Sequence, residues 1–579
     1  MRLTVLVLSM IVLTASTLSV RADERPIIFI PGIIGSKLVE QGDPSKVVWG
    51  SLASLRKSQT AKMNLLPASG TPVPLEPGDI LRDFNLAFGA FEVGIYSHLI
   101  NFLTGTRQSA KDMAFSPELT ENQNFFVFAY DWRRSVFANG VRFAHFIEEK
   151  VPNGEFDIVA HSMGGLVTRA MLSSKRPGDR CVETNADYPA DIGGADLTAV
   201  CTAAYFDLTA DAWDTKPDVS SRLHSFVEVG VPHFGSVATV STMRDGSGSN
   251  LANRLLGGLT HLQDVSTSMV GVFELTPTYE NCCWIKSTDD DSFRQLNLFR
   301  DSFIRDHWMG KIVPITTSPC GFSNCDQRAA IIEIGLANRA LLDEIMADKL
   351  PDGVQSNHVL RGTKTSDTPS RYYVERPFRN AQDSVVVDGS LDGDGTVHEF
   401  SAKAPGASGQ AGVNEGLVAF TKHQALFRDS ATKRYLGRFV IDEVAPPPAW
   451  SSAERDDLQI AGATIDATSF EAVPSIVEPG QSLPLAFIVD RVNSDGNAFD
   501  QVALEGLRYG LQYTRLDDGA DQAAQDLSDT LSLAEETDLR AVFRGSPVSP
   551  EVEGIYLYEV LMDGVSLGET TVYVLSSEG

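Results

Sequence analysis

The chain is short of positive charge. Among its 579 residues, 48 Lys and Arg stand against 76 Asp and Glu, which gives a formal net charge of -28 at pH 7. Such a surface repels phosphate backbones and anionic headgroups, so nucleic acid and anionic membranes are excluded as electrostatic partners. Any lipid surface would have to be contacted transiently, through apolar side chains.

Long apolar runs are scarce as well, and the main one opens the chain. Arg2 precedes the apolar run Leu3–Leu13, and Val20-Arg-Ala22 places small residues where a signal peptidase reads. We predict a signal peptide over residues 1–22, and hence a secreted or periplasmic protein that starts at Asp23. The alternative is an uncleaved anchor, although the run is shorter than the roughly 20 residues that span a bilayer.

Cysteine is also rare, with six in the chain. Exported chains keep cysteines as disulfides because their surroundings are oxidising. Cys181 and Cys201 bracket a polar loop, and we expect a bridge that closes this insertion. Sequence does not choose the connectivity of the second group, for which a zinc site is the alternative reading. That group is Cys282, Cys283, Cys320 and Cys325.

The most informative segment is Phe156-Asp-Ile-Val-Ala-His-Ser-Met-Gly-Gly-Leu-Val167. Its apolar start is typical of a short buried strand, and Gly164 and Gly165 open a helical pattern. This is the arrangement of a nucleophile elbow, in which a tight turn lifts the Ser162 hydroxyl clear of the sheet. Ala160 replaces the first glycine of the GxSxG pattern. An ordinary buried Ser-Gly turn is the alternative.

A nucleophilic serine needs a base and an acid, which this type of site supplies in the order Ser, Asp, His. The apolar run Ser384–Asp388 leads into a glycine-rich loop that carries Asp394, our candidate acid. Gly416–Phe420 reads as a buried strand that ends near His423, our candidate base. We therefore expect Ser162, Asp394 and His423 to meet at one edge of a parallel sheet.

Other residues compete for these roles. Asp392 could replace Asp394, and His398 is a rival base, although it lies in the same loop as the acid. The loop also fits a calcium reading, because four residues fall at EF-hand positions around Gly393. Those four are Asp388, Ser390, Asp392 and Glu399. An EF-hand needs a preceding helix, whereas this segment reads as strand, so we expect neither a metal nor a cofactor.

An oxyanion hole requires one backbone amide after the nucleophile and a second from an early loop. Arg25–Ile30 reads as a strand that runs into Pro31-Gly-Ile-Ile-Gly-Ser36, where glycines let the backbone turn toward a substrate. The amides of Ile33 and Met163 are the expected donors.

Six motifs, in order along residues 25 to about 440, resemble the lecithin:cholesterol acyltransferase family of α/β-hydrolases. They are Ile30-Pro-Gly-Ile-Ile-Gly-Ser-Lys-Leu38, Ala129-Tyr-Asp-Trp-Arg133, Ala160-His-Ser-Met-Gly164, Phe273-Glu-Leu-Thr-Pro277, Gly393-Asp-Gly-Thr-Val397 and Lys422-His-Gln-Ala-Leu426. The resemblance maps the family's triad onto Ser162, Asp394 and His423. It implies a lipid substrate such as a phospholipid or acylglycerol, with lipase, phospholipase or O-acyltransferase activity. The insertion Val39–Leu119 has no cysteine, so the family's disulfide-closed membrane-binding loop does not carry over.

Three further residues are expected to support the site without reacting. His161 and His233 are read as orienting or packing residues, and Asp131 as a side chain that anchors a strand end by hydrogen bonds. Apolar stretches in the first insertion, around Trp49 and Met63, and in the cap at Asn250–Leu259 either contact lipid or belong to the core.

At this length the chain exceeds one domain. After Pro446-Pro-Pro448, short alternating runs replace helical periodicity beyond about residue 466, which predicts an immunoglobulin-like antiparallel sandwich. The expected domains are a 23–445 α/β-hydrolase with cap insertions and a mainly parallel sheet, a 446–465 linker and a 466–579 sandwich. The predicted function is that of an exported serine hydrolase or O-acyltransferase of acyl-ester lipids. The alternatives are a hydrolase of non-lipid esters or polyesters and an inactive binding protein; the oligomeric state is not predicted.

Overall fold

A computed structural model defines the architecture for most of the chain. It describes residues 25–51, 54, 56–82, 87–88, 91–92, 96–105, 119–178, 181, 197–206, 208, 210–245, 256, 258–279, 282–287, 293–295, 325–363, 368–376, 384–390, 393–403, 413–419, 423, 426–427, 430–441, 458–460, 463–465, 467–472, 476–490, 509–515, 525–527, 531–536, 540–562 and 565–574. The predicted signal peptide lies outside these residues, as do Asp392 and Cys320.

A six-stranded sheet organises the larger part of the molecule, in the order β15-β12-β9-β8-β1-β7, and every neighbouring pair is parallel. Its strands are β1 (Ile27–Ile30), β7 (Phe125–Val127), β8 (Phe156–His161), β9 (Leu223–Val229), β12 (Ser356–Thr363) and β15 (Val413–Ala419). All side chains of β1 and β8 are buried, as expected of parallel strands that are covered on both faces. The predicted α/β class with a mainly parallel central sheet is confirmed.

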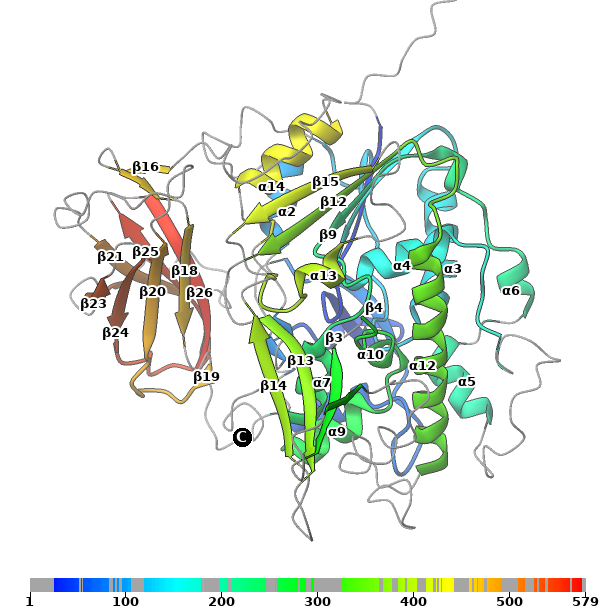
Figure 1. The fold of residues 1–579 in the computed structure, drawn as a ribbon, viewed down its shortest axis with the longest axis horizontal. Coiled ribbons are helices and arrows are strands. Elements are labelled where there is room, and N and C mark those ends of the chain that lie inside the picture. The colour runs from blue at the N-terminus through cyan, green and yellow to red at the C-terminus, as the bar shows by residue number, and fades with distance from the viewer. Residues whose placement is uncertain are drawn as a thin grey trace, which may run out of the picture.

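Three helices lie together on one side of this sheet (Figure 1): α3 (Val136–Lys150), α4 (Met163–Leu172) and α12 (Cys325–Ala347). The hydroxyl of Ser135 accepts a hydrogen bond from the Phe137 amide and so caps the start of α3. Gly140 lets α3 approach α4 closely, since a Cβ at this position would lie 3.0 Å from the Met171 nitrogen. The helix that follows Ser162 is therefore packed firmly in place.

The first insertion forms a small antiparallel sheet beside the start of the central one. The strands of this sheet are β2 (Ser36–Glu40), β3 (Asp43–Trp49) and β4 (Leu75–Ile80). The same part of the chain also forms α1 (Lys57–Thr60), η3 (Ala61–Met63), the two-stranded pair β5 (Ala87–Phe88) and β6 (Phe91–Glu92), and α2 (Ser97–Thr104). Trp49 and Met63 are at most 1 % exposed, and Leu65 and Leu66 are buried too. These residues belong to the core and do not form an exposed surface that could contact a lipid bilayer.

The cap region combines short helices with a four-stranded sheet of order β11-β10-β13-β14. Its elements are α5 (Leu197–Tyr205), α6 (Ala210–Asp214), η5 (Ser220–Arg222), α7 (Val237–Asp245), α9 (Leu259–Ser266), α10 (Val270–Phe273), β10 (Cys283–Ser287), β11 (Phe293–Gln295), β13 (Thr368–Arg376), β14 (Ser384–Ser390) and α13 (Glu399–Ala402). The predicted disulfide between Cys181 and Cys201 is confirmed, with an S–S distance of 2.05 Å. Cys282 is also disulfide-bonded, so the zinc reading fails for this residue.

One expectation about the central sheet is wrong. The strand that precedes the candidate acid, β14, pairs antiparallel with β13 and lies outside the central sheet. The apolar run Ser384–Asp388 identified a strand, but periodicity carries no information on its pairing partner. After β12 the chain leaves the central sheet and forms β13 and β14 in the separate four-stranded sheet. It returns to the edge of the central sheet at Asp394.

The C-terminal strands form two sheets, drawn in brown to red in Figure 1. Their orders are β18-β20-β24-β23 and β19-β26-β25-β21-β22. After α14 (Ser430–Tyr435), the π-helical η7 (Leu436–Ile441), β16 (Leu458–Ile460) and β17 (Ala463–Ile465), the strands are β18 (Ala467–Ala472), β19 (Ile476–Val477), β20 (Leu485–Asp490), β21 (Tyr509–Arg515), β22 (Gln525–Asp526), β23 (Leu531–Glu536), β24 (Arg540–Gly545), β25 (Gly554–Met562) and β26 (Val565–Val574).

Both C-terminal sheets contribute to one apolar cluster. Phe487 and Phe543 enter it from one sheet, and Tyr558 and Val572 enter it from the other. The immunoglobulin-like character of these strands and the domain boundaries stay predictions. Within the described part of the chain, no helix is both long enough and apolar enough to cross a bilayer.

Candidate active site

Ser162 occupies a strained turn between β8 and α4. Its backbone angles are φ 52° and ψ -127°, a region that residues with a side chain rarely adopt. The Ser162 amide donates to the Val229 carbonyl at 2.9 Å, and its carbonyl accepts from the Gly165 amide at 2.9 Å. Hydrogen bonds to two separate segments hold the serine in this conformation at the end of a central strand.

Glycines around the turn make room for the serine. A Cβ at Gly32 would lie 2.8 Å from the Ser162 Cβ, and one at Gly164 would lie 2.6 Å from the Pro31 carbonyl oxygen. A Cβ at Gly165 would meet a Val231 methyl at 2.2 Å. Contacts below 3.0 Å are not tolerated, so strand, loop and helix close around Ser162 only because these positions lack side chains.

Asp394 and His423 form a buried pair, at 1 % and 4 % exposure. His423 Nδ1 lies 2.7 Å from Asp394 Oδ2, and the His423 amide donates to the Asp394 carbonyl at 2.8 Å. The other carboxylate oxygen, Oδ1, accepts from the amides of Thr396 at 3.0 Å and Val397 at 2.7 Å. The carboxylate is thus held in one orientation and aims at one ring nitrogen of the histidine.

The imidazole of His423 lies beside the serine turn. A Cβ at Gly230 would be 3.0 Å from His423 Nδ1, and Gly230 directly follows the Val229 carbonyl that binds the Ser162 amide. The ring of His161, the residue before Ser162, has its centroid 4.7 Å from that of His423. The structure therefore places the Asp394–His423 pair beside the turn that carries Ser162. Among the hydrogen bonds of described residues, none uses His423 Nε2, the ring nitrogen away from Asp394.

The two candidate oxyanion donors lie on either side of Ser162. Met163 is the first residue of α4, so its amide has no partner within the helix and lies at the positive end of the helix dipole. Ile33 follows Gly32, which packs on the Ser162 side chain, and Ile34 has a positive φ of 56°. Among the described residues, no hydrogen bond involves the amide of either donor.

The His161 side chain is buried and lies next to His423. Its Nδ1 lies 2.9 Å from the Tyr96 hydroxyl, and its Nε2 lies 3.2 Å from the His423 carbonyl oxygen. Burial, followed by the neighbouring His423, holds the pKa of His161 well below its usual value, so the ring is neutral. Sequence reasoning missed Tyr96, because it lies in the insertion, within no motif.

His233 lies in a loop that braces the acid. Its Nε2 is 2.8 Å from Glu228 Oε2, and Glu228 accepts two bonds from the Arg169 guanidinium, at 2.6 and 3.1 Å. Burial alone would raise the pKa of Glu228, but Arg169 and His233 outweigh it and lower the pKa to about 2. In the same loop, Ser236 donates to the Thr396 carbonyl beside Asp394 at 2.5 Å.

Asp131 lies in the segment between β7, which ends at Val127, and α3, so the prediction that it marks a strand end is not met. Its carboxylate accepts bonds from Arg133 at 2.8 and 2.7 Å and from Arg134 at 3.1 Å. Burial alone would raise the pKa of Asp131, but the two arginines lower it to about 2. The Asp131 carbonyl accepts a hydrogen bond from the Asn139 side-chain amide at 3.0 Å, which ties the segment after β7 to α3.

The competing candidates Asp392 and His398 and the calcium hypothesis all concern the loop around Asp394. The ring of His398 stacks on Tyr279 at 6.1 Å, and its carbonyl accepts bonds from the first turn of α13. Asp392 lies outside the described residues. Strand β14 ends at Ser390, where an EF-hand needs a helix, and Glu399 begins α13. Across the described part of the chain, no three His, Cys, Asp or Glu side chains are placed to hold a metal ion.

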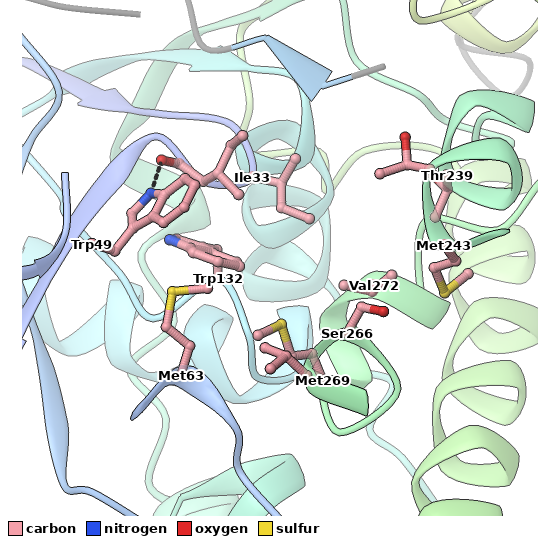
Figure 2. A pocket seen from close by; sticks show the side chains of 12 residues that line it. Ile33, Trp49, Met63, Trp132, Thr239, Met243, Ser266, Met269 and Val272 are labelled. Carbon is pink, nitrogen blue, oxygen red and sulfur yellow. Dashed lines mark hydrogen bonds between the residues drawn. The ribbon is translucent and has the colours of Figure 1, made fainter. Parts of the chain in front are cut away.

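An apolar pocket adjoins the oxyanion loop. It is lined by Ile33, Ile34, Trp49, Met63, Trp132, Thr239, Thr242, Met243, Val265, Ser266, Met269 and Val272. Figure 2 shows Trp49 and Trp132 on one wall, with Thr239 and Met243 facing them from the cap. A Cβ at Gly271, between the lining residues Met269 and Val272, would lie 2.9 Å from the Met163 side chain, so this wall of the pocket packs against the first residue of α4.

The fold and the site define an α/β protein with a serine on a strained turn beside a buried aspartate–histidine pair. Residues 116–331 match the family model described as lecithin:cholesterol acyltransferase, so this part of the chain is similar to that family, which confirms the predicted resemblance.

No curated protein matches the chain. Among solved structures, the Tle4–Tli4 complex is similar at 14 % identity and a TM-score of 0.45, covering 73 % of this chain and 99 % of that one. Yersinia pseudotuberculosis InvD is similar at 16 % identity and a TM-score of 0.12, covering 18 % of this chain and 27 % of that one. At these TM-scores, neither likeness defines the fold.

Proposed function

We propose that the protein is an exported serine hydrolase or O-acyltransferase that acts on acyl-ester lipids through an acyl-enzyme. The observation that carries this proposal is the 2.7 Å contact between Asp394 and His423 beside the strained turn of Ser162. Each member of a Ser-His-Asp triad has a matching group here, in the chain order of α/β-hydrolases.

The reaction begins when His423 Nε2 takes the proton of the Ser162 hydroxyl as the oxygen attacks the ester carbonyl carbon. The carbonyl oxygen becomes an oxyanion, which accepts hydrogen bonds from the amides of Ile33 and Met163. When the tetrahedral intermediate collapses, the bond to the alcohol breaks and the alcohol leaves with the proton from His423. The acyl group stays on Ser162 as an ester.

Water or a second alcohol then attacks the acyl-enzyme, with His423 acting again as base and then as acid. Water gives a free fatty acid, and a lipid alcohol gives a new ester. Asp394 holds the imidazole in the required tautomer and stabilises its charged form. Each oxyanion amide is expected to contribute roughly 3 kcal/mol of transition-state stabilisation. Which product forms depends on how far the closed site excludes water.

Two observations support a lipid acyl group as the substrate. The pocket between Trp49, Trp132 and Met243 is apolar and starts at the oxyanion loop, where an acyl chain attached to the reacting carbonyl would extend. Residues 116–331 also match a family named for an acyltransferase of lecithin and cholesterol. The disulfide Cys181–Cys201 supports export, as the predicted signal peptide requires.

The test is a doubly labelled phospholipid, with and without a sterol or diacylglycerol acceptor, beside a short-chain nitrophenyl ester. Ser162→Ala is expected to lower every activity by about 10³-fold or more, because triad members act as a unit. Ser174→Ala, an exposed serine, is the matched control and should retain full activity.

The outcomes separate the rival functions. Turnover of the nitrophenyl ester alone would favour a hydrolase of non-lipid esters. No turnover of any ester, together with no labelling of Ser162 by a fluorophosphonate, would favour a binding protein and overturn the proposal.

A further inference from the structure

We propose that Tyr96 and His161 form a positioning relay that fixes the oxyanion loop and the catalytic base relative to each other. The inference rests on the proposed function, but neither residue takes part in the bond changes described above. Tyr96 comes from the first insertion, which the sequence associates with lipid contact or with the core.

The relay is a continuous line of hydrogen bonds. The Gly32 amide donates to the Tyr96 hydroxyl oxygen at 3.0 Å, and that oxygen lies 2.9 Å from His161 Nδ1. His161 Nε2 lies 3.2 Å from the carbonyl oxygen of His423. Tyr96, His161 and His423 are each 4 % exposed or less, so water competes little for these bonds.

Only one arrangement of protons satisfies every contact. The Gly32 amide can only donate and the His423 carbonyl can only accept. His161 must therefore carry its proton on Nε2, and its Nδ1 accepts the single hydroxyl proton of Tyr96. Burial raises the pKa of Tyr96 and lowers that of His161, so both groups stay neutral and this arrangement persists across the working pH range.

One end of the relay contacts the oxyanion loop, and the other contacts the catalytic base. These two parts of the site must keep a fixed position relative to each other. Gly32 precedes Ile33, the proposed oxyanion donor, and packs on Ser162. At the other end, both backbone groups of His423 are hydrogen-bonded: its amide donates to the Asp394 carbonyl, and its carbonyl accepts from His161 Nε2. A shift of about 1 Å between nucleophile, base and oxyanion donor costs roughly 10²-fold in rate.

Packing holds the relay side chains where they are. The Tyr96 ring contacts Phe29 of β1 edge-on at 5.0 Å and Phe427 at 6.3 Å, and the His161 ring contacts Phe427 at 5.4 Å. Removing the Tyr96 hydroxyl should therefore leave the ring in place, which makes the phenylalanine variant a clean test.

The experiment compares Tyr96→Phe with Tyr130→Phe, using a short-chain nitrophenyl ester. Tyr130 is also buried, at 1 % exposure, but within the described residues its hydroxyl has no hydrogen-bond partner. We expect Tyr96→Phe to lower kcat about 10- to 100-fold with KM within about twofold, because the interaction orients groups in the transition state. Tyr130→Phe should keep the wild-type kcat and KM.

A second readout does not depend on turnover. Nitrogen-15 NMR of labelled histidine should show His161 protonated on Nε2 in the wild type and in Tyr130→Phe, and a changed Nδ1 resonance in Tyr96→Phe. His161→Gln, which can still donate to the His423 carbonyl, should retain more activity than His161→Phe.

The failures are distinguishable. A wild-type protein without ester turnover would overturn the proposed function. An active wild type with an equally active Tyr96→Phe variant, or with a His161 proton on Nδ1, would overturn the relay alone. A Tyr96→Phe loss confined to KM or to thermal stability would also overturn the relay.

Discussion

Two buried pairs of a carboxylate and an imidazole lie close together in this molecule, Asp394 with His423 and Glu228 with His233. Their contact distances are 2.7 and 2.8 Å, and all four side chains are 4 % exposed or less. Both pairs lie against the same short segment, because Glu228 is two residues before Gly230, which packs on the His423 ring. By distance and burial alone, the pairs could not be told apart.

What separates them is the second partner of each carboxylate. Asp394 is held by the backbone amides of Thr396 and Val397, which orient the carboxylate and leave its charge uncompensated. Glu228 is bound through both oxygens by the Arg169 guanidinium, and this ion pair ties α4 to β9. A carboxylate that already has a cation stabilises an imidazolium less, so we infer that the first pair is catalytic and the second structural.

The largest expected difference is in activity. Asp394→Asn should lower kcat by about 10⁴-fold, since the histidine loses the partner that selects its tautomer. Glu228→Gln should keep kcat within about tenfold, because it alters a pair that does not reach Ser162. Steady-state kinetics on a nitrophenyl ester measures both.

The comparison would break if Glu228→Gln lost as much activity as Asp394→Asn while remaining folded. Circular dichroism of both variants at the assay temperature is the control for folding.

The second difference is in stability. Glu228→Gln should cost about 3–5 kcal/mol of unfolding free energy, because it leaves the Arg169 guanidinium buried without its counter-charge. Denaturant unfolding of the variant against the wild type gives this value. Replacing both partners, as Arg169→Met with Glu228→Gln, should recover much of the loss.

A double variant no more stable than Glu228→Gln would show that the pair itself, and not the isolated charge, matters. Asp394→Asn should lose less stability than Glu228→Gln, since no charged partner is stranded.

The smallest effect concerns pH. Glu228 has its pKa lowered from 4.5 to about 2 in the folded protein, so it contributes about 3 kcal/mol of stability that is present above pH 4.5. That contribution should disappear as the pH falls from 4.5 toward 2. Unfolding midpoints measured across this range should decline more gently in Glu228→Gln than in the wild type.

Glu274 provides a control of opposite sign. Its carboxylate accepts hydrogen bonds from Ser135, Val136 and Asn338; burial outweighs these bonds and the charge of the neighbouring Arg339 and raises its pKa from 4.5 to about 7. Because the folded protein favours protonated Glu274, this group stabilises the fold below pH 4.5. That stabilisation is lost as the pH rises through 7. Glu274→Gln should therefore reduce the pH dependence of stability only between pH 4.5 and 7. A reduced pH dependence below pH 4.5 would contradict the raised pKa of Glu274.

Local features of this protein could be read from the sequence. The turn at Ser162 depends on Gly164 and Gly165, its neighbours in the chain, and the buried strands β1 and β8 are short segments rich in apolar residues. The bridge between Cys181 and Cys201 follows from two cysteines that bracket one loop. Steric limits and burial act over a few residues, so the pattern of residue types is enough to predict them.

Partners that are distant in the sequence could not be read in this way. Three contacts join segments whose amino-acid composition does not identify the partner segment. They are the antiparallel pairing of β14 with β13, the hydrogen bond between Tyr96 and His161 and the ion pair of Arg169 with Glu228. The sequence by itself determined the strained serine turn and the apolar strands. Only the tertiary structure decided which carboxylate faces His423 and which is neutralised by an arginine, because that choice depends on three-dimensional proximity between side chains of the same chemical type.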